Sequence, residues 1–515
     1  MIAAARPPQQ PGPAPRTQEP PRTQEILQRI EEILGPRGYL HKPEDLTLYE
    51  YDGGLDKSRP DLVVFPQSTE HVVAIVKLAN ELALPIVGRG AGTGLSGGAI
   101  ARAGGIVISF ARMNRILEID LPNERAVLEP GVVNLDITQA VEADGYFYAP
   151  DPSSQRACTI GGNVSENSGG PHTLAYGVTT NHVLGLEAVL PDGSVIGGAA
   201  PRAAGSGGAA PCAAACIGSS LGDYDLPGYD LTGLLVGSEG TMVLVTKIAV
   251  RLMRKPEMVQ TILAIYDRAE DAGDTVAEIT ARAITPAAIE MLDGPLLKMI
   301  EEATHAGYPS DAAAVLLIEL EGLKETVEEQ IEHVREACGC CRVREFRVAR
   351  TAEERELLWK GRKNAFGAVG RFSPAYYVQD GVVPRTQIAP TLRFIGRLAE
   401  RYDLAISNIF HAGDGNLHPL IMFDPRTPGA LETVRRASDE ILEFCISVGG
   451  SITGEHGVGM EKMEMMERQF SDASLQMIGR FKSLFDPGCR LNPGKVLPTG
   501  RGCMEIRQRV GDLSL

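Results

Sequence analysis

Three histidines and one glutamate stand in two short segments of the C-terminal half, at spacings that allow them to meet. His411 and His418 flank Asp414-Gly415, a strong two-residue turn signal between two apolar runs. A hairpin centred on this turn places the two histidines directly opposite each other, with Cβ atoms about 4.5–5.5 Å apart. Glu455-His456 lies between two glycines further along the chain. Two histidines and a carboxylate can share a divalent metal and leave positions open for a substrate. The alternative is a packed histidine pair beside a turn.

Glycines gather with Ser, Thr and Asn in three segments of the N-terminal half. The first, residues 87–98, satisfies G-x-G-x-x-G from Gly92 to Gly97. A dinucleotide-binding fingerprint of the Rossmann type must open a helix, whereas this segment runs on to Gly104-Gly105 and a strand. Successive bare N–H groups in such a loop form a nest for an anion. The segment therefore predicts a phosphate-binding loop, and the alternative is a mobile surface loop.

The second glycine segment starts at Thr159 and continues to Gly170, and the third is Val236–Thr241. Because glycine lets the backbone approach a phosphate closely, three such segments fit one long, phosphate-bearing ligand that lies along a domain. A dinucleotide such as FAD suits this pattern.

A family resemblance is carried by the loop RGAGTGLSGG, the runs TIGGNVSENSGG and VGSEGT, and the segments HAGDGNLHP, TGEHGVG and LNPGKVLP. Together they resemble the D subunit of bacterial glycolate oxidase and the FAD-linked D-lactate and D-2-hydroxy-acid dehydrogenases. These belong to the vanillyl-alcohol-oxidase (PCMH-type) flavoprotein superfamily. The resemblance covers roughly residues 40–498. It implies an α+β fold, in which a PCMH-type FAD-binding domain is followed by an α+β cap domain with an antiparallel sheet.

The resemblance also implies the residues of the site. His411, His418 and Glu455 are expected to hold one divalent metal, and His456 to remove the hydroxyl proton of the substrate. Zn²⁺ is the default for this ligand set, and Mn²⁺, Fe²⁺ or Co²⁺ are compatible with it. The residues expected to bind FAD are Arg89, Gly90, Ala91, Gly92, Thr93, Gly94, Ser96, Gly97, Pro150, Asp151, Thr159, Gly161, Gly162, Asn163, Asn167, Gly237, Glu239, Gly240 and Asn492.

A cation is needed for the substrate carboxylate, and arginine binds carboxylates with a planar fork. By resemblance this cation is Arg362, with Arg371 and Lys363 as alternatives. Relatives of the 2-hydroxyglutarate type carry a lysine where Val378 stands here. Glycolate or lactate is therefore favoured over a diacid.

The function implied is FAD-dependent oxidation of glycolate, or of a small D-2-hydroxy acid, to the 2-oxo acid by hydride transfer to the flavin. FAD is expected to be noncovalent because residues 88–98 contain neither His nor Cys. A D-lactate dehydrogenase is the alternative enzyme. From another class, the chain could be a non-catalytic flavin-binding subunit that transfers electrons. The electron acceptor is unknown, and other glycolate oxidase subunits are the partners that the resemblance suggests.

Strand and helix patterns divide the chain at Pro256. Before it, a strand–helix–strand start covers residues 62–87, and an Asp192-Gly193 hairpin follows. After it, strands such as Met258–Tyr266 alternate with long helices, among them Ala352–Val369, which favours an antiparallel sheet. The predicted organisation is a disordered tail over 1–24, an FAD-binding domain over 25–255 with an insertion near 197–222, a cap domain over 256–498, and a C-terminal tail over 499–515.

Composition excludes several classes of protein. Lys and Arg number 50 against 66 Asp and Glu, a net charge of −16, which argues against binding to nucleic acid. The nine cysteines show no paired C-x-x-C spacing, and no signal peptide or long apolar run is recognised. We therefore expect a cytoplasmic protein with free thiols and no transmembrane segment, held at the inner membrane, if at all, through partner subunits.

Overall fold

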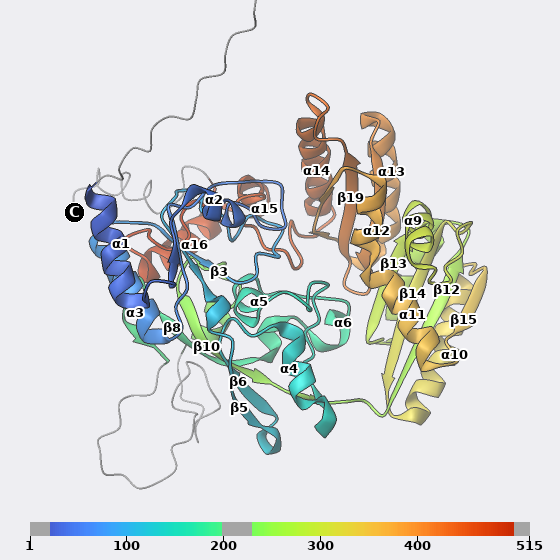
Figure 1. Ribbon diagram of the computed structural model, residues 1–515. Coiled ribbons are helices and arrows are strands. Elements are labelled where there is room, and N and C mark those ends of the chain that lie inside the picture. Colours follow the sequence, from blue (N-terminus) through green and yellow to red (C-terminus); the bar gives the residue numbers. More distant parts are fainter. Residues whose placement is uncertain (1–20, 198–228, 499–515) are drawn as a thin grey trace, which may run out of the picture.

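The computed structural model describes residues 21–197 and 229–498, which form two domains side by side (Figure 1). Residues 1–20 of the predicted N-terminal tail, the predicted C-terminal tail and nearly all of the predicted insertion near 197–222 lie outside the described residues. The N-terminal boundary needs one correction, because helix α1 (Pro21–Leu34) already begins inside the segment predicted as a disordered tail. From Ile26 onward, the apolar face of α1 packs against the helix and strands that follow.

The first domain opens with a small four-stranded sheet in the order β1-β2-β4-β3. Strands β2, β4 and β3 are parallel, so the predicted strand–helix–strand start is confirmed, with β4 inserted between its two strands. The Ser68 side chain accepts from the backbone N–H of His71 and caps helix α3. The elements are β1 (Tyr39–Leu40), α2 (Pro43–Leu46), β2 (Leu62–Val64), α3 (Thr69–Glu81), β3 (Ile86–Arg89) and β4 (Ile106–Ser109).

A five-stranded antiparallel sheet in the order β5-β6-β10-β8-β9 completes the first domain. The hairpin predicted at Asp192-Gly193 is confirmed by the pairing of β8 with β9. The strands are β5 (Ile116–Asp120), β6 (Arg125–Leu128), β8 (Val183–Val189), β9 (Val195–Ile196) and β10 (Leu244–Arg251), and a separate pair is formed by β7 (Tyr146–Phe147) and β11 (Met253–Arg254). The helices are α4 (Asn134–Val141), α5 (Ile160–Glu166), α6 (Thr173–Tyr176) and α7 (Leu231–Leu235).

The second domain is built on an eight-stranded antiparallel sheet, which confirms the predicted α+β class. Seven of its strands follow the order β15-β12-β14-β13-β18-β19-β16, and β17 also pairs with β19. The strands are β12 (Met258–Tyr266), β13 (Ala288–Asp293), β14 (Ala314–Gly322), β15 (Glu345–Val348), β16 (Ala375–Val378), β17 (Gly381–Val382), β18 (Ala405–His411) and β19 (Asn416–Phe423).

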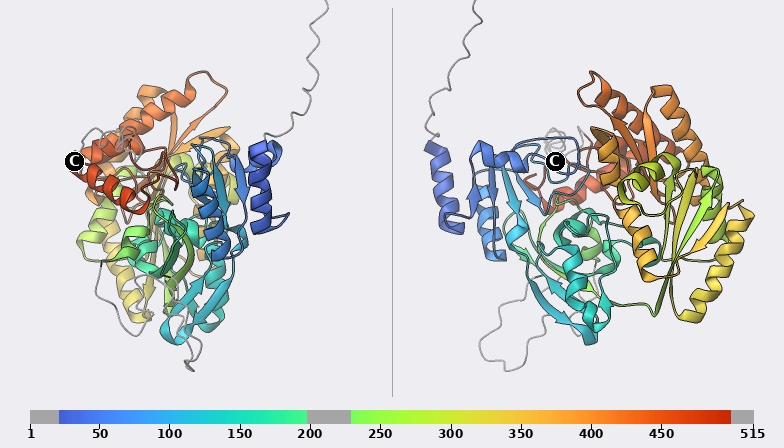
Figure 2. Two further views of the ribbon diagram at one scale, coloured as in Figure 1. Left: turned by 90° about the vertical axis from the view of Figure 1, so that its left-hand side faces the viewer. Right: turned by 45° about the vertical axis from the view of Figure 1, so that its right-hand side comes forward.

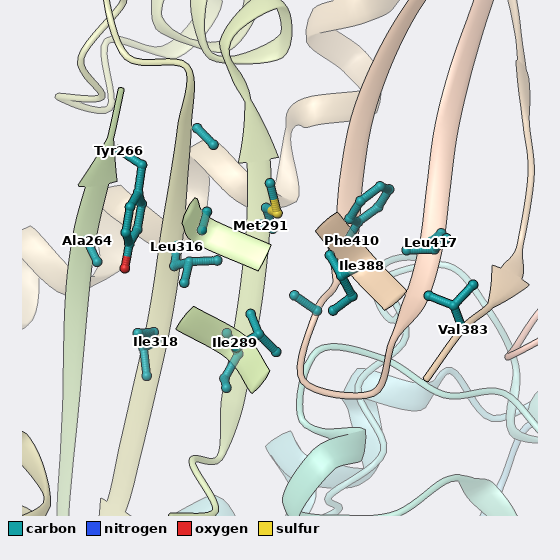
Figure 3. Packing of buried hydrophobic residues seen from close by; sticks show 14 of the residues in the cluster. Ala264, Tyr266, Ile289, Met291, Leu316, Ile318, Val383, Ile388, Phe410 and Leu417 are labelled. Carbon is teal, nitrogen blue, oxygen red and sulfur yellow. The ribbon is translucent and has the colours of Figure 1, made fainter. Parts of the chain in front are cut away.

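Helices cover both faces of this sheet, so its central strands are apolar on both sides. In β12, Ala264 and Tyr266 point into one hydrophobic cluster and Leu263 and Ile265 into the other. Figure 3 shows the first cluster, where side chains from β12, β13, β14, β18 and β19 meet. The helices on that face are α8 (Ala269–Ala281), α10 (Lys324–Cys340), α13 (Ile388–Tyr402) and α14 (Ala430–Ser447), and those on the other are α9 (Gly294–Thr304), α11 (Ala352–Lys363) and α12 (Ala365–Phe372).

The end of the described chain returns to the first domain, although the sequence places it in the cap domain. Short helix α15 (Met466–Gln469) and helix α16 (Asp472–Phe485) lead back, and α16 lies among the elements of the first domain in all views (Figures 1 and 2). Leu491 then bridges to Ile86 of β3 and joins the hydrophobic cluster of the first sheet. The sequence boundary at Pro256 therefore marks only one of two crossings between the domains.

Candidate active site

A cavity of about 580 Å³ is lined by both domains and contains most of the residues expected to bind FAD. The main chain of the first glycine segment forms one wall, and the region around Thr159 and Glu239 forms others. The predicted FAD residues that line it are Arg89, Gly90, Ala91, Gly92, Thr93, Gly94, Thr159, Gly161, Gly162, Asn163, Glu239 and Gly240. The segment 90–105 contains no helix, as expected for a nest rather than a Rossmann fingerprint.

Seven predicted FAD residues are not among those that line the cavity: Ser96, Gly97, Pro150, Asp151, Asn167, Gly237 and Asn492. The Asn492 side chain donates to the carbonyls of Gly98 and Glu239, at 2.9 and 2.8 Å, and so joins the first and third glycine segments. Asp151 instead contacts His172, 2.8 Å away, at the boundary with the second domain. Direct contact of these seven residues with the cofactor stays a prediction.

The second glycine segment is partly helical rather than a loop. Thr159 caps helix α5, its hydroxyl accepting from the N–H of Gly162 at 3.3 Å. Gly161 packs so closely on Pro130 that a Cβ would stand 2.6 Å from the proline ring, so glycine is needed here for close packing.

The second domain also contributes to the cavity wall, and one of its residues, Tyr376, was not predicted from the sequence. Tyr376 and Val378 come from β16 and Lys363 from the end of α11, all in the second domain. Arg89 Nη1 and Glu166 Oε2 are buried side-chain atoms without a hydrogen-bond partner among the described residues. Such atoms in a glycine-lined cavity fit a bound polar cofactor, because buried polar groups are nearly always paired.

The histidine hairpin forms, but its predicted register is wrong. His411 lies opposite Asn416, and His418 lies opposite Ile409, so residues 412–415 form a four-residue turn. The register differs from the prediction by two residues, which returns each side chain to the same face of the sheet. The two imidazoles are therefore diagonal neighbours, with ring centroids 5.1 Å apart.

The longer turn is held by contacts that lie far away in the sequence. The N–H of Gly413 donates to the carbonyl of Ile289 at 3.0 Å, and the N–H of Val383 donates to the carbonyl of Gly415 at 2.9 Å. No local pattern reveals these partners, which is why the Asp-Gly signal alone predicted the shorter turn.

A buried carboxylate fixes His411 from behind. Glu290 stands directly opposite His411 in the register of β13 and β18. Its Oε1 lies 2.7 Å from His411 Nδ1, and its Oε2 accepts from Nε of Arg362 at 2.6 Å. Burial raises the pKa of Glu290, but Arg362 and His411 outweigh it and hold this pKa below its usual value. Glu290 is a site residue that the sequence reasoning missed.

Arg362, the residue predicted to bind the substrate carboxylate, lies next to Glu290 in the structure. Its side chain is 1% exposed, it is paired with Glu290, and it does not line the cavity. The neighbouring Lys363 does line the cavity, and of the two alternatives it is the one that the structure places there. The assignment of Arg362 to the substrate carboxylate stays a prediction, and in this structure its side chain faces β13 rather than the cavity.

Glu455 brings the remaining groups together. Its Oε1 lies 3.3 Å from His411 Nε2, 3.2 Å from His418 Nε2 and 3.7 Å from His456 Nε2. His456 stacks on His418 with ring centroids 4.9 Å apart. His418, Glu455 and His456 all line the same cavity as the glycine segments. The predicted metal ligands and base are thus gathered at one end of the predicted cofactor cavity.

Burial and charge act differently on the two histidines. Burial lowers the pKa of His411, but Glu290 and Glu455 outweigh it and raise that pKa to about 10. Burial is the main reason that the pKa of His456 falls to about 4, so its imidazole is neutral near pH 7. Glu290 and Glu455 therefore favour a positive charge on the ring of His411, whereas the ring of His456 is neutral.

The residues present fit a divalent metal. His411, His418 and Glu455 each offer one ligand atom, all within 4.8 Å of one another. The outer nitrogens of the two imidazoles face Glu290 and the carbonyl of Gln379, which orients their inner nitrogens toward Glu455. A second trio contains Asp380, but that carboxylate is already taken up by Lys462 and backbone N–H groups. The first trio is the better metal site.

Comparison with known proteins gives the family. Residues 60–197 match the family model of the FAD binding domain, and residues 255–496 that of the FAD linked oxidases, C-terminal domain. The chain is 43% identical over 482 residues to the glycolate oxidase subunit GlcD of Escherichia coli (strain K12), covering 93% of this chain and 92% of that protein. The chain belongs to this FAD-linked oxidase family. It is also 34% identical over 441 residues to a D-lactate dehydrogenase of Archaeoglobus fulgidus, covering 85% and 91%.

Membership of the FAD-linked oxidase family confirms the resemblance and makes the chain an FAD-dependent oxidoreductase of the hydroxy-acid type. The structure of p-cresol methylhydroxylase superposes with a TM-score of 0.75 at 17% identity, covering 92% of this chain and 97% of that one. This likeness confirms the PCMH-type fold.

Proposed function

We propose that the chain oxidises glycolate, or another small D-2-hydroxy acid such as D-lactate, to the 2-oxo acid. FAD supplies the hydride acceptor for this reaction. The observation that carries the proposal is the shared cavity: the glycine segments of the FAD-binding domain and the His418–Glu455–His456 group line one space. A non-catalytic electron-transfer subunit would not require these titratable groups beside the cofactor.

FAD is proposed to bind noncovalently. The first glycine segment contains neither His nor Cys, and the histidines that line the cavity, His418 and His456, belong to the Glu455 cluster. Cys158 also lines the cavity, but burial raises the pKa of its thiol, so it stays protonated and is a poor nucleophile.

We infer that His411, His418 and Glu455 hold one divalent cation, with Zn²⁺ as the default and Mn²⁺, Fe²⁺ or Co²⁺ as alternatives. Such a cation acts as a Lewis acid toward the hydroxyl oxygen of a 2-hydroxy acid. Glu290 orients His411, and Arg362 in turn neutralises Glu290. Arg362 is therefore a positioning residue in this proposal.

His456 is proposed to take the hydroxyl proton of the substrate. It lines the cavity, and its lowered pKa keeps the imidazole unprotonated near pH 7, which is the form that a general base requires. Lys363 is proposed to attract the substrate carboxylate, because it and Arg89 are the two cationic side chains that line the cavity in the described parts of the chain. Arg89 lies in the first glycine segment, so it is assigned to FAD rather than to the substrate.

Small substrates are favoured by the walls of the cavity in the second domain. Val378 and Phe366 present apolar surface there, which offers no partner to a second carboxylate. Initial rates with glycolate, D-lactate and D-2-hydroxyglutarate, measured with an artificial dye acceptor, test this assignment. Turnover of the two monoacids with little turnover of the diacid is expected, and a preference for the diacid would contradict it.

We also propose that the chain works with other subunits that accept its electrons, since its relatives are named as glycolate oxidase subunits. In residues 21–197 and 229–498, no helix is long and apolar enough to span a membrane. An association with the inner membrane would then come through those partner subunits.

A further inference from the structure

Residues 453–461, here called the Glu455 loop, connect the two domains through their backbone N–H groups. The N–H groups of residues 454–456 donate to the carboxylate of Asp380, at 2.9–3.3 Å. The hydroxyl of Thr453 and Nζ of Lys462 donate to the same carboxylate, at 2.6 and 3.1 Å. Asp380 lies between β16 and β17, so this half of the loop is anchored on the second domain.

The other half of the loop is anchored on the FAD-binding domain. The N–H groups of residues 458 and 459 donate to the two carboxylate oxygens of Glu239, at 2.7 and 2.6 Å. Those of residues 460 and 461 donate to the carbonyl of Ser96, at 2.9 and 3.3 Å. Glu455 and His456 therefore belong to the half of the loop held by Asp380, and the half held by the FAD-binding domain begins two residues after His456.

Both anchors on the FAD-binding domain belong to segments that form the cofactor cavity. Glu239 and Gly240 line the cavity, as do Gly94 and Leu95 just before Ser96. The side chain of Asn492 joins these two segments behind the wall. A change in how rigidly the glycine segments are held should therefore alter the contacts that hold the Glu455 loop.

Gly459 lies so close to Ser96 that there is no space for a side chain at position 459. Gly459 has a φ of +53°, in the left-handed region, and a Cβ there would overlap the carbonyl oxygen of Ser96. The loop thus needs glycine both for its backbone conformation and for its approach to the cofactor segment.

We propose that Glu239 is a positioning residue that makes the order of the Glu455 loop depend on bound FAD. In this proposal, bound FAD holds the first and third glycine segments in one conformation. Ser96 and Glu239, which belong to those segments, then hold the loop through its backbone N–H groups. The inference rests on the proposed function only through the roles of Glu455 and His456. Such coupling is reciprocal: FAD strengthens the binding of a ligand to the loop, and that ligand strengthens the binding of FAD by the same factor.

Hydrogen exchange of the backbone amides in residues 453–461 tests this proposal. In the wild-type protein, exchange is expected to be slower with FAD bound than after FAD is removed. Glu239→Gln replaces one of the two acceptor oxygens by a donor, so we expect the loop of the FAD-bound variant to exchange roughly 10- to 100-fold faster than wild type, as for the loss of one hydrogen bond to a charged group.

Two matched controls separate this effect from general destabilisation. Glu187→Gln alters another buried carboxylate of the same domain, which pairs with Lys247 and does not contact the loop. Gly459→Ala is paired with Gly429→Ala, where φ is +77° and a Cβ would meet no atom within 4 Å. Faster exchange of the loop is expected in Glu239→Gln and Gly459→Ala and not in the two controls.

Two results would overturn the proposal: equal exchange of the wild-type loop with and without FAD, or wild-type protection in FAD-bound Glu239→Gln. The measurement uses neither substrate nor metal. Loss of the proposed function would appear instead as a flavin that hydroxy acids do not reduce, so the two failures are distinguishable.

Discussion

Single residues of the active site act through partners that lie far apart in the sequence. His411 is oriented by Glu290, which precedes it by 121 positions and stands opposite it in the sheet. His418 is oriented by the carbonyl of Gln379. These outer contacts determine which nitrogen of each ring faces Glu455.

Substitution of a proposed metal ligand, His418, and substitution of the proposed base, His456, are expected to have different effects. His418→Ala should lose the metal and abolish turnover yet retain FAD, because the glycine segments belong to the other domain. His456→Ala should retain metal and FAD but slow flavin reduction by about 10²–10⁴-fold. Elemental analysis, flavin absorbance and anaerobic stopped-flow kinetics measure these properties. An unchanged metal content in His418→Ala would rule out the assigned ligand set.

Arg362 and Lys363 are adjacent, yet different losses are expected from their substitution. Lys363→Met should raise KM for glycolate by about tenfold, as for one charge-assisted hydrogen bond, and leave the metal content unchanged. Arg362→Lys should instead lower the metal content, because it weakens the pairing that holds Glu290 against His411. If Arg362→Lys raised KM with full metal content, the carboxylate would have to be assigned to Arg362.

The sequence predicted most of the residues that gather at the site, but it missed Glu290 and did not show how each residue is used. The error in the hairpin register was harmless because it equals the two-residue side-chain period of a strand. The pairing of Arg362 with Glu290 was not predicted, because Glu290 lies on another strand and no spacing within α11 indicates that the side chain turns toward it.

At the scale of elements, strand β12 was predicted over its full length, since its apolar run is long and bounded by clear signals. The predicted helix over residues 352–369 is two helices, α11 and α12, with a break at Asn364, where ψ is 6°. The break lets α12 pack against α9 while α11 carries Lys363 to the cavity. Helical periodicity continues across such a break, so the sequence alone does not reveal it.

A buried histidine links the two domains and gives the interface a pH dependence. His172 lies 2.8 Å from Asp151 and 3.0 Å from Glu319 of β14, and it stacks on Trp359. Burial lowers the pKa of His172, but the two carboxylates outweigh it and hold the pKa well above 6.5. The stabilisation is therefore complete below the unfolded pKa of about 6.5 and is lost as pH rises through the folded pKa.

His172→Gln is expected to destabilise the protein by about 2 kcal/mol at pH 6, the scale of a hydrogen bond to a charged group. The difference in Tm from wild type should shrink as the pH is raised from 6 into the alkaline range. Thermal unfolding of the two proteins across that range measures it. A Tm difference independent of pH would show that His172 is not charged in the folded protein.

At the scale of the whole molecule, the active site exists only because the chain crosses between domains twice. The first crossing is the boundary near Pro256, which the sequence indicates. The second returns residues 472–498 to the first domain, where Lys482 bonds the carbonyl of Thr241 and Leu491 pairs with Ile86. These contacts join segments far apart in the sequence, so only the folded structure shows that Asn492 braces the cofactor cavity.

The central claim is that one cavity brings FAD and the His–Glu cluster together to oxidise a small 2-hydroxy acid. Anaerobic addition of glycolate to the purified, FAD-bound protein tests it most directly, with the flavin absorbance as readout. We expect the yellow colour to bleach in wild type, far more slowly in His456→Ala, and not at all in His418→Ala. A flavin that stays oxidised in wild type with both glycolate and D-lactate would contradict the claim.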